Sequence, residues 1–238
     1  MIASINKLYR QLFCRGGYGI HSPFVFDLIT EVIEEQKPYY CYEPLHAVRL
    51  QLLQNPHKVN VHNRTLSIKK AIKTYSFTEG EDRLLFRLAN RFQPKKILIF
   101  GSNFGLTPLY LTAYSKDSVC IIIEPEPSIS AIADEYLKKY ATASVVLHNN
   151  CKEIPAHLDF IVWDNSFTMS KFESFLSHIS DNSVMVIAGI NASSENRKVW
   201  KAVCVHPKVT VTIDFYRFGV VFFNPKYHQK TYQSVVVD

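Results

Sequence analysis

The chain has 238 residues, of which 47% are hydrophobic and 20% charged, and its formal net charge is +6. This length and composition suit a folded protein with one sizeable core and argue against intrinsic disorder. Lys and Arg residues are scattered along the chain, and a small positive balance does not by itself indicate nucleic acid, so we expect no nucleic-acid partner. No apolar stretch has the length of a membrane span, which predicts a cytoplasmic protein without a membrane partner.

The cysteines and histidines do not follow a metal-binding or disulfide pattern. The five cysteines are widely spaced and odd in number, and no two of them form a CxxC pair. The nine histidines show neither HxxxH nor HExxH spacing. We therefore predict reduced thiols and no bound metal.

The first part of the chain, residues 1–93, reads as helical and is expected to form an N-terminal cap. Apolar residues near the N-terminus recur at helical spacing and predict an amphipathic helix. Ser22 and Pro23 are suited to the N-cap and first position of a helix, and Thr78 with Glu81 fits a capping box. Helices are expected from 22 to about 36, from 43 to before 55, over 67–75 and from 78, and a loop is expected over 58–64.

The second part, residues 94–238, alternates short β-branched runs with helical stretches. Continuous apolar runs at 97–100 and 119–123 are typical of strands buried on both faces, as in a parallel sheet. The alternation predicts an α/β fold with a doubly wound, mostly parallel, seven-stranded sheet and a C-terminal antiparallel hairpin. Further strands are expected at 144–147, 160–163 and 184–188, the hairpin at 209–213 and 220–223, and a short edge strand after 226.

A glycine-containing loop directly follows the first of these strands. Its residues are Gly101, Ser102, Asn103, Phe104 and Gly105, and a helix follows at once. Sheets of this kind bind nucleotides at this place, because the chain turns sharply and small residues let a ligand approach the backbone. The alternative is a tight strand-to-helix turn that binds nothing.

Three further strand ends carry polar side chains. Glu124 ends the second strand, 23 residues after Gly101, where a carboxylate can accept hydrogen bonds from both ribose hydroxyls of a nucleoside cofactor. Asn150 follows the third strand, where its amide can bind the edge of adenine. Asp164 ends the fourth strand and can hold a cofactor amino group or orient an acceptor hydroxyl. Each also has a plain alternative: an exposed strand-end carboxylate for Glu124, and turn formation for Asn150 and Asp164.

His21 lies in a segment with three glycines, just before the helix that Ser22 caps. It could act as a base or as a substrate contact. The alternative is a structural hydrogen bond near the start of the helix.

Several stretches resemble one protein family. Residues 19–28 read GIHSPFVFDL, residues 105–111 read GLTPLYL, and residues 208–223 close with KVTVTID and GVVFF. In these stretches the chain resembles bacterial class I S-adenosylmethionine (SAM)-dependent O-methyltransferase-like proteins with an N-terminal GxHSPFVFDL segment. The resemblance covers nearly the whole chain. It implies SAM as cofactor, a SAM-binding sheet, and a helical cap over a small-molecule acceptor.

The chain also departs from this family near the expected reaction centre. The family carries an acidic residue two positions before the first glycine, where this chain has Ile99, and an acidic pair after the fifth strand, where it has Ala188 and Gly189. A divalent metal needs several hard oxygen ligands, so these losses argue against a metal-dependent enzyme.

Two functional hypotheses follow. The first is methyl transfer from SAM to a small molecule, at a hydroxyl and without metal, with Asp164 as catalytic residue and His21 as substrate contact. The cofactor-binding residues would be Gly101, Ser102, Asn103, Gly105, Glu124, Asn150 and Asp164. The second is a catalytically inactive methyltransferase-fold protein that serves as an interaction module. A homodimer is left open in both.

Overall fold

The computed structural model describes residues 10, 14, 16, 17, 19–61, 64–150, 154–164 and 166–236. Contacts between residues divide the chain into two compact units. We call Gln36–Glu153 the central unit, and Met1–Glu35 together with Ile154–Val237 the terminal unit. The expected N-terminal amphipathic helix lies outside the described residues except for Arg10, and the expected division at residue 93 stays a prediction.

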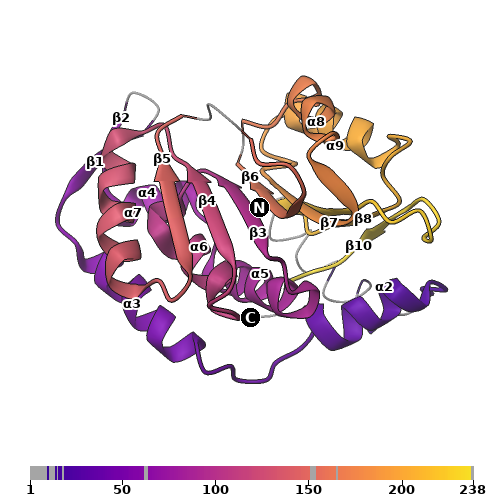
Figure 1. Cartoon of the computed structure of the whole chain (residues 1–238), viewed down its shortest axis with the longest axis horizontal. Helices are drawn as coiled ribbons and strands as arrows, with labels where there is room; N and C mark the ends of the chain where they lie inside the picture. The colour runs from indigo at the N-terminus through magenta and orange to yellow at the C-terminus, as the bar shows by residue number, and fades with distance from the viewer. Residues whose placement is uncertain are drawn as a thin grey trace. The chain divides into compact units, whose positions relative to one another are not determined.

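Three parallel strands form the core of the central unit, in the order β3-β4-β5 (Figure 1). They are β3 (Lys96–Phe100), β4 (Val119–Ile123) and β5 (Ser144–His148). The apolar runs at 97–99 and in β4 are largely buried, as expected for strands covered on both faces. The helices are α3 (Tyr42–Gln54), α4 (Ile68–Tyr75), α5 (Glu79–Phe92), the 3₁₀ turn η2 (Asn103–Gly105), α6 (Leu106–Thr112) and α7 (Pro127–Tyr140).

The helix start predicted from Thr78 and Glu81 is confirmed. Thr78 accepts a hydrogen bond from the backbone N–H of Glu81, and the Glu81 carboxylate accepts one from the N–H of Thr78. This reciprocal pair satisfies two N–H groups that a helix start leaves without partners. It fixes the start of α5, which packs on α6, the helix that follows the glycine loop.

The loop expected over 58–64 is a β-hairpin instead. Strand β1 (Lys58–Val61) pairs antiparallel with β2 (Arg64–Ser67), and Asn60 lies opposite Thr65. Val59 and Val61 are buried while Lys58 and Asn60 are exposed, so the segment alternates with the period of a strand. This period was present in the sequence and was overlooked because four residues are a short signal.

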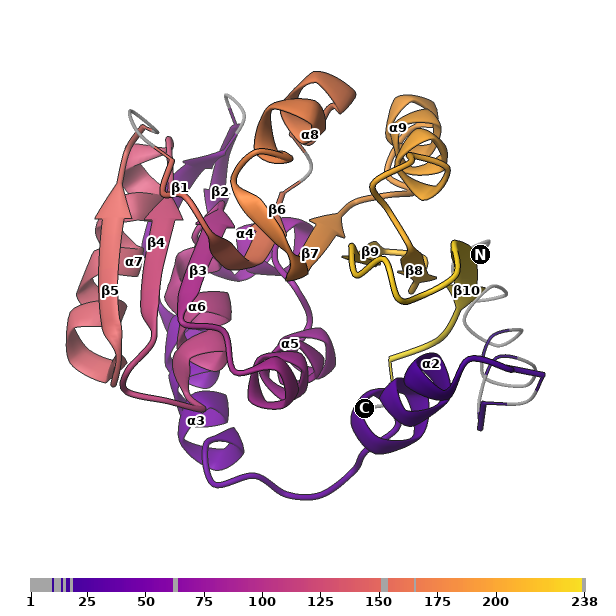
Figure 2. The same ribbon diagram turned by 45° about the vertical axis from the view of Figure 1, so that its right-hand side comes forward.

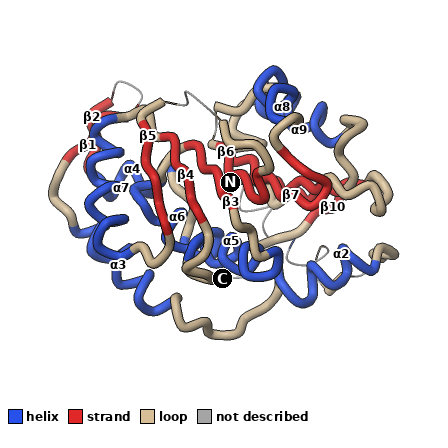
Figure 3. The backbone as a smooth tube through the Cα atoms, viewed as in Figure 1, coloured by secondary structure: helices blue, strands red, loops and turns tan. Residues whose placement is uncertain are grey.

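Among its described residues the terminal unit holds five strands, in the order β6-β7-β9-β8-β10 (Figure 2), and the strands are drawn in red in Figure 3. β6 and β7 are parallel, and β8 and β9 form the expected antiparallel hairpin. These pairings and the parallel strands of the central unit confirm the α/β fold class. β10 is the expected edge strand and pairs parallel with β8. The elements are α2 (Pro23–Leu28), the π-helix η1 (Ile29–Ile33), β6 (Leu158–Trp163), α8 (Met169–Phe175), β7 (Ile179–Ala188), α9 (Ser194–Cys204), β8 (Val211–Asp214), β9 (Phe218–Phe222) and β10 (Lys230–Gln233).

The N-terminal GIHSPFVFDL segment docks on the end of the C-terminal hairpin. Ser22 caps α2 by accepting a hydrogen bond from the N–H of Val25, and Pro23 occupies the first turn. The Phe24 ring stacks on Tyr227 at 4.0 Å and meets the edge of Phe222 at 5.2 Å, both measured between ring centroids. Aromatic pairs of this kind hold segments together that are far apart in sequence. The two family-like ends of the chain therefore pack against each other.

The packing of β9 against α9 in the terminal unit can be tested at Gly219. A Cβ atom at this position of β9 would lie 2.3 Å from the ring of Trp200, which is buried on α9. We predict that Gly219→Ala lowers the free energy of unfolding by about 1–3 kcal/mol, because a buried ring cannot move aside freely. Urea denaturation followed by circular dichroism measures the loss. In a Trp200→Leu background the same substitution should be less harmful, and an equal loss in both backgrounds would contradict the steric explanation.

Candidate functional site

The glycine loop leaves β3 through a run of left-handed backbone conformations. Gly101 has φ 80°, Asn103 φ 47°, Phe104 φ 59° and Gly105 φ 86°. Non-glycine residues adopt this region rarely, and a bulky one such as Phe104 is strained there. The loop is therefore held by surrounding contacts rather than by its own preferences.

Glu124 supplies the first of these contacts, from the end of the neighbouring strand β4. Its Oε2 accepts hydrogen bonds from both the backbone N–H and the hydroxyl of Ser102, each at 2.8 Å. Its Oε1 accepts one from the N–H of Glu126 at 3.1 Å. Both Ser102 and Glu124 are buried. A buried carboxylate needs such donors, so this contact ties the loop firmly to β4.

The same geometry bears on the predicted ribose contact. With Ser102 in place, Oε2 has both of its lone pairs engaged, whereas Oε1 can still accept one more hydrogen bond. Glu124 can thus receive one ribose hydroxyl as it stands. It can receive two only if the Ser102 hydroxyl turns away. The ribose role of Glu124 stays a prediction, to which the structure adds a second role in holding the loop.

Gly105 permits close packing between the loop and α7. A Cβ atom there would lie 3.4 Å from the backbone oxygen of Ala133 and 3.4 Å from Cγ of Leu137. Its left-handed φ also disfavours any other residue. This glycine therefore has a structural reason to be where it is, whether or not a ligand binds.

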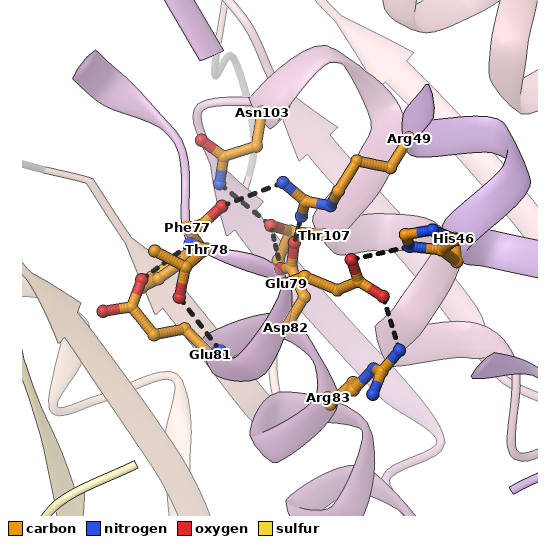
Figure 4. Close-up of polar contacts among 10 residues, drawn as sticks. All are labelled: His46, Arg49, Phe77, Thr78, Glu79, Glu81, Asp82, Arg83, Asn103 and Thr107. Carbon is orange, nitrogen blue, oxygen red and sulfur yellow. Dashed lines mark hydrogen bonds and ion pairs between the residues drawn. The ribbon is translucent and has the colours of Figure 1, made fainter. Parts of the chain in front are cut away.

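A buried polar network holds the other side of the loop, and sequence reasoning missed it (Figure 4). The amide of Asn103 donates to the Thr107 hydroxyl at 3.1 Å, and this hydroxyl donates to Asp82 Oδ1 at 2.7 Å. Arg49 forms an ion pair with the other oxygen of Asp82 and also donates to the carbonyl of Phe77. Asp82 is fully buried. The network thereby links the loop to α6, α5 and α3.

A second ion-pair cluster lies one turn earlier on α5. The Glu79 carboxylate receives Arg83 at 2.6 Å and the imidazole of His46 at 2.8 Å (Figure 4). Burial acts to raise the pKa of Glu79, but His46 and Arg83 outweigh it and the pKa is lowered. The Glu79 carboxylate therefore stays ionised near neutral pH, and its contacts with His46 anchor α3 to α5.

The Asp82 network makes the stability of the protein depend on pH. Burial raises the pKa of Asp82 from 3.8 to about 7, against the opposing effects of Arg49 and Thr107. Between these values the folded chain holds a proton that the unfolded chain releases, so the contribution of Asp82 to stability falls as pH rises. We predict that the free energy of unfolding of the wild type, relative to Asp82→Asn, decreases from about pH 4 to about pH 7. Urea denaturation of both proteins across this range measures the difference, and a difference independent of pH would contradict the prediction.

Asn150 lies in the central unit, beyond the end of β5, and is exposed. Its neighbour Asn149 accepts a hydrogen bond from Ser130 on α7 at 3.2 Å. Gly101, Ser102, Asn103, Gly105, Glu124 and Asn150 therefore share one unit, and the hydrogen bonds described above join Ser102 to Glu124. The adenine contact of Asn150 stays a prediction.

The remaining candidates, Asp164 and His21, belong to the terminal unit. Asp164 follows β6, is half-buried, and accepts a hydrogen bond from the N–H of Ser166 at 2.8 Å. This is the turn-forming geometry expected of Asp, and one of its oxygens has no contact among the described residues. His21 is exposed just before α2. Their catalytic and substrate-binding roles stay predictions.

Apolar groups occupy the two places where the resembled family has acids. Ile99 in β3 is completely buried. After β7, a small pocket is lined by apolar side chains and one amide. Its lining residues are Phe167, Ile187, Ala188, Ile190, Asn196, Val199 and Trp200. Phe167 packs edge-on against Trp163 at 5.3 Å, so a bulky ring closes one side of this pocket.

The described part of the chain shows neither a metal-binding cluster nor a membrane-spanning helix, and its cysteines are free thiols. There, no three His, Cys, Asp or Glu side chains are grouped to hold a metal ion. Cys14, Cys41, Cys120 and Cys204 are free thiols, and burial raises the pKa of Cys41 to about 11. None of the described helices combines the length and hydropathy needed to cross a bilayer.

Comparison with known proteins supports the fold. No protein-family model matches the sequence, and no curated protein matches it either. Solved structures do match. A methyltransferase from Geobacter sulfurreducens aligns with a TM-score of 0.58 at 13% identity, over 85% of this chain and 97% of its own. A methyltransferase from Podospora anserina bound to S-adenosylhomocysteine (SAH) has a TM-score of 0.56 at 14% identity, over 79% and 98%.

A third similar structure is the O-methyltransferase TomG from Streptomyces achromogenes, in complex with SAM, with a TM-score of 0.55 at 16% identity over 79% of this chain and 91% of its own. At these identities the similarity concerns the fold. This chain therefore has the Rossmann-like fold of class I methyltransferases, as the sequence predicted.

Proposed function

We propose that the protein binds SAM and transfers its methyl group to a small-molecule acceptor, at a hydroxyl and without metal. The observation that carries this proposal is the hydrogen-bonded unit of Ser102 and Glu124, which joins a left-handed glycine turn after β3 to a carboxylate at the end of β4. In parallel α/β sheets, ligands bind at the carboxyl ends of the strands, and this unit lies there.

The residues of the central unit fit the nucleoside half of SAM. Glu124 retains an acceptor site on Oε1 for a ribose hydroxyl, and the exposed amide of Asn150 follows the next strand, where it is free to meet adenine. Gly101 lets the ligand approach the backbone. Asn103 shapes the loop through Thr107 and Asp82, and its contact with the cofactor stays a prediction.

The chemistry at the acceptor follows from the cofactor and one carboxylate. When bound, SAM supplies a methyl group already activated on a sulfonium, so the protein mainly has to align the acceptor oxygen with it. Asp164 keeps one carboxylate oxygen available while Ser166 holds the other. In the transfer, which exchanges the S–CH₃ bond of SAM for a C–O bond and leaves SAH, that oxygen would accept the proton that the acceptor hydroxyl loses. His21, exposed before α2, is assigned to contact the acceptor.

The second candidate is an inactive methyltransferase-fold protein that serves as an interaction module. It is favoured by the buried Ile99 in place of an acid and by the apolar pocket after β7. Phe104 is also buried within the glycine loop. These features reduce the polar groups left for the methionine end of SAM, whereas the ribose carboxylate is retained.

Calorimetric titration with SAH separates the two candidates. We expect SAH to bind the wild type, and Glu124→Gln to weaken binding by roughly tenfold to a hundredfold, because a charge-assisted acceptor is lost. Glu126→Gln is the matched control, since it removes a carboxylate two residues away but keeps the backbone N–H that Glu124 accepts. Thermal melts establish that both variants are folded.

Ser102→Ala sharpens the same experiment. It removes the hydroxyl that competes for Oε2 and leaves the backbone N–H donor. SAH should bind this variant as tightly as the wild type or more tightly. No heat of binding to the wild type at saturating SAH would contradict the proposal and favour the interaction module.

A further inference from the structure

The net charge of the chain is concentrated in one segment. Residues 44–78 contain six Lys and Arg residues and no Asp or Glu, while the other 21 basic residues of the chain equal its 21 acidic residues in number. The whole charge of +6 therefore resides in this segment. The basic residues themselves are spread evenly along the sequence. The excess of positive charge in residues 44–78 arises because this segment contains no Asp or Glu.

Five of the six cations are exposed. Arg49 is buried and paired with Asp82. The other five are Lys58, Arg64, Lys69, Lys70 and Lys73, which we call the basic patch. No ion pair joins them to an acidic side chain within the described ranges. Elsewhere, exposed lysines such as Lys138 and Lys198 do have acidic neighbours.

The three lysines of α4 share one face of the helix. Ile68, Ala71 and Ile72 are buried, so Lys69, Lys70 and Lys73 project from the opposite side. Lys58 and Arg64 lie on the β1–β2 hairpin that leads into this helix. Lys69 and Lys73 lie four residues apart, a rise of about 6 Å along the helix, so the backbone positions of these three lysines fall within about one Debye length at physiological salt.

The basic patch belongs to the carboxyl edge of the central strands. Figure 2 shows the β1–β2 hairpin beside the ends toward which β4 and β5 point. The Ser128 hydroxyl, just beyond β4, accepts from the N–H of Asn60 at 3.1 Å and contacts Glu126 at 3.1 Å. The N–H of Glu126 in turn donates to Glu124. Helix α4 also contacts the 3₁₀ turn of the glycine loop.

We propose that the basic patch binds the phosphate groups of a phosphorylated small-molecule acceptor. This inference rests on the proposed function, because it places the acceptor beside the glycine loop. Five cations that form no ion pair within the described ranges match a ligand with several negative charges, as a di- or triphosphate has, better than a single carboxylate. Lys binds phosphate as a point charge and Arg can bind it through two parallel hydrogen bonds.

The extent of the patch favours a small ligand over a nucleic acid. A specific nucleic-acid interface buries on the order of 1,000 Å² or more and contacts phosphates along several turns. Here the excess charge covers one hairpin and one short helix, and the rest of the chain is balanced. A phosphate-bearing tail of about 12 Å matches the length of the eight-residue helix α4.

Titration with inorganic tripolyphosphate at low salt tests the proposal. We expect it to bind the wild type, and the combined variant Lys69→Gln, Lys70→Gln, Lys73→Gln to bind about tenfold more weakly or worse. The matched control removes three exposed cations from α9: Arg197→Gln, Lys198→Gln, Lys201→Gln. This control should bind within about twofold of the wild type. No binding to the wild type, or an equal loss in both variants, would overturn the proposal.

Two parallel titrations distinguish a phosphate site from the SAM site and from nucleic-acid binding. SAH binding should be the same in the α4 variant and the wild type, so loss of tripolyphosphate with SAH binding intact supports a distinct phosphate site. If SAH fails to bind the wild type while tripolyphosphate binds with the expected dependence on α4, the proposed function fails and the phosphate site stands. If a single-stranded oligouridylate binds far more tightly than tripolyphosphate, and more so with length, the partner is a nucleic acid and the proposal is wrong.

Discussion

The carboxylate of Glu124 is buried at the end of β4 and receives three hydrogen bonds from the chain itself. Two of them come from Ser102, so the strained turn after β3 is bound to the neighbouring strand. The other side of the turn is held by Asn103 through Thr107 and Asp82. With both sides fixed, α6 is placed against β4 and α5 against α6, and the backbone of the loop is held in one conformation.

This arrangement explains why the protein can be interpreted as either an enzyme or an inactive relative. If Glu124 binds the ribose as we propose, its carboxylate is shared between the ligand and the loop that it holds. The buried Ile99 and the apolar pocket after β7 remove acids that the resembled family carries. In the proposed cofactor site, the residues for the nucleoside half are therefore better preserved than those for the methionine half. The basic patch that we propose for the acceptor would place part of the acceptor binding outside the region where acids are missing.

Much of the fold could be predicted from the sequence because its signals are local. The capping pair of Thr78 and Glu81 identified the start of α5, and the apolar runs identified β3 and β4. The β1–β2 hairpin was missed because four alternating residues resemble a polar loop. β7 begins at Ile179, ahead of the expected residue 184, since pairing of Ile179 with Leu158 lengthens a strand whose first residues are polar.

The candidate site was predictable only in outline. Position along the chain was sufficient to select Glu124 and the glycine loop as candidates. The hydrogen bonds between Glu124 and Ser102 of that loop became apparent only in the structure. Asp82 was missed because an acid in the first turn of a helix usually faces solvent and favours the helix dipole. Here it is buried and pairs with Arg49, which lies 33 residues earlier in the chain.

A crystal structure of the protein grown with SAH tests the central claim most directly. The account predicts a ribose hydroxyl on Glu124, with the Ser102 hydroxyl turned away from Oε2 if both ribose hydroxyls bind, and an otherwise unchanged loop held by Asn103 and Thr107. Well-ordered crystals in which Ser102 still occupies Oε2 and no SAH binds beside Glu124 would contradict it.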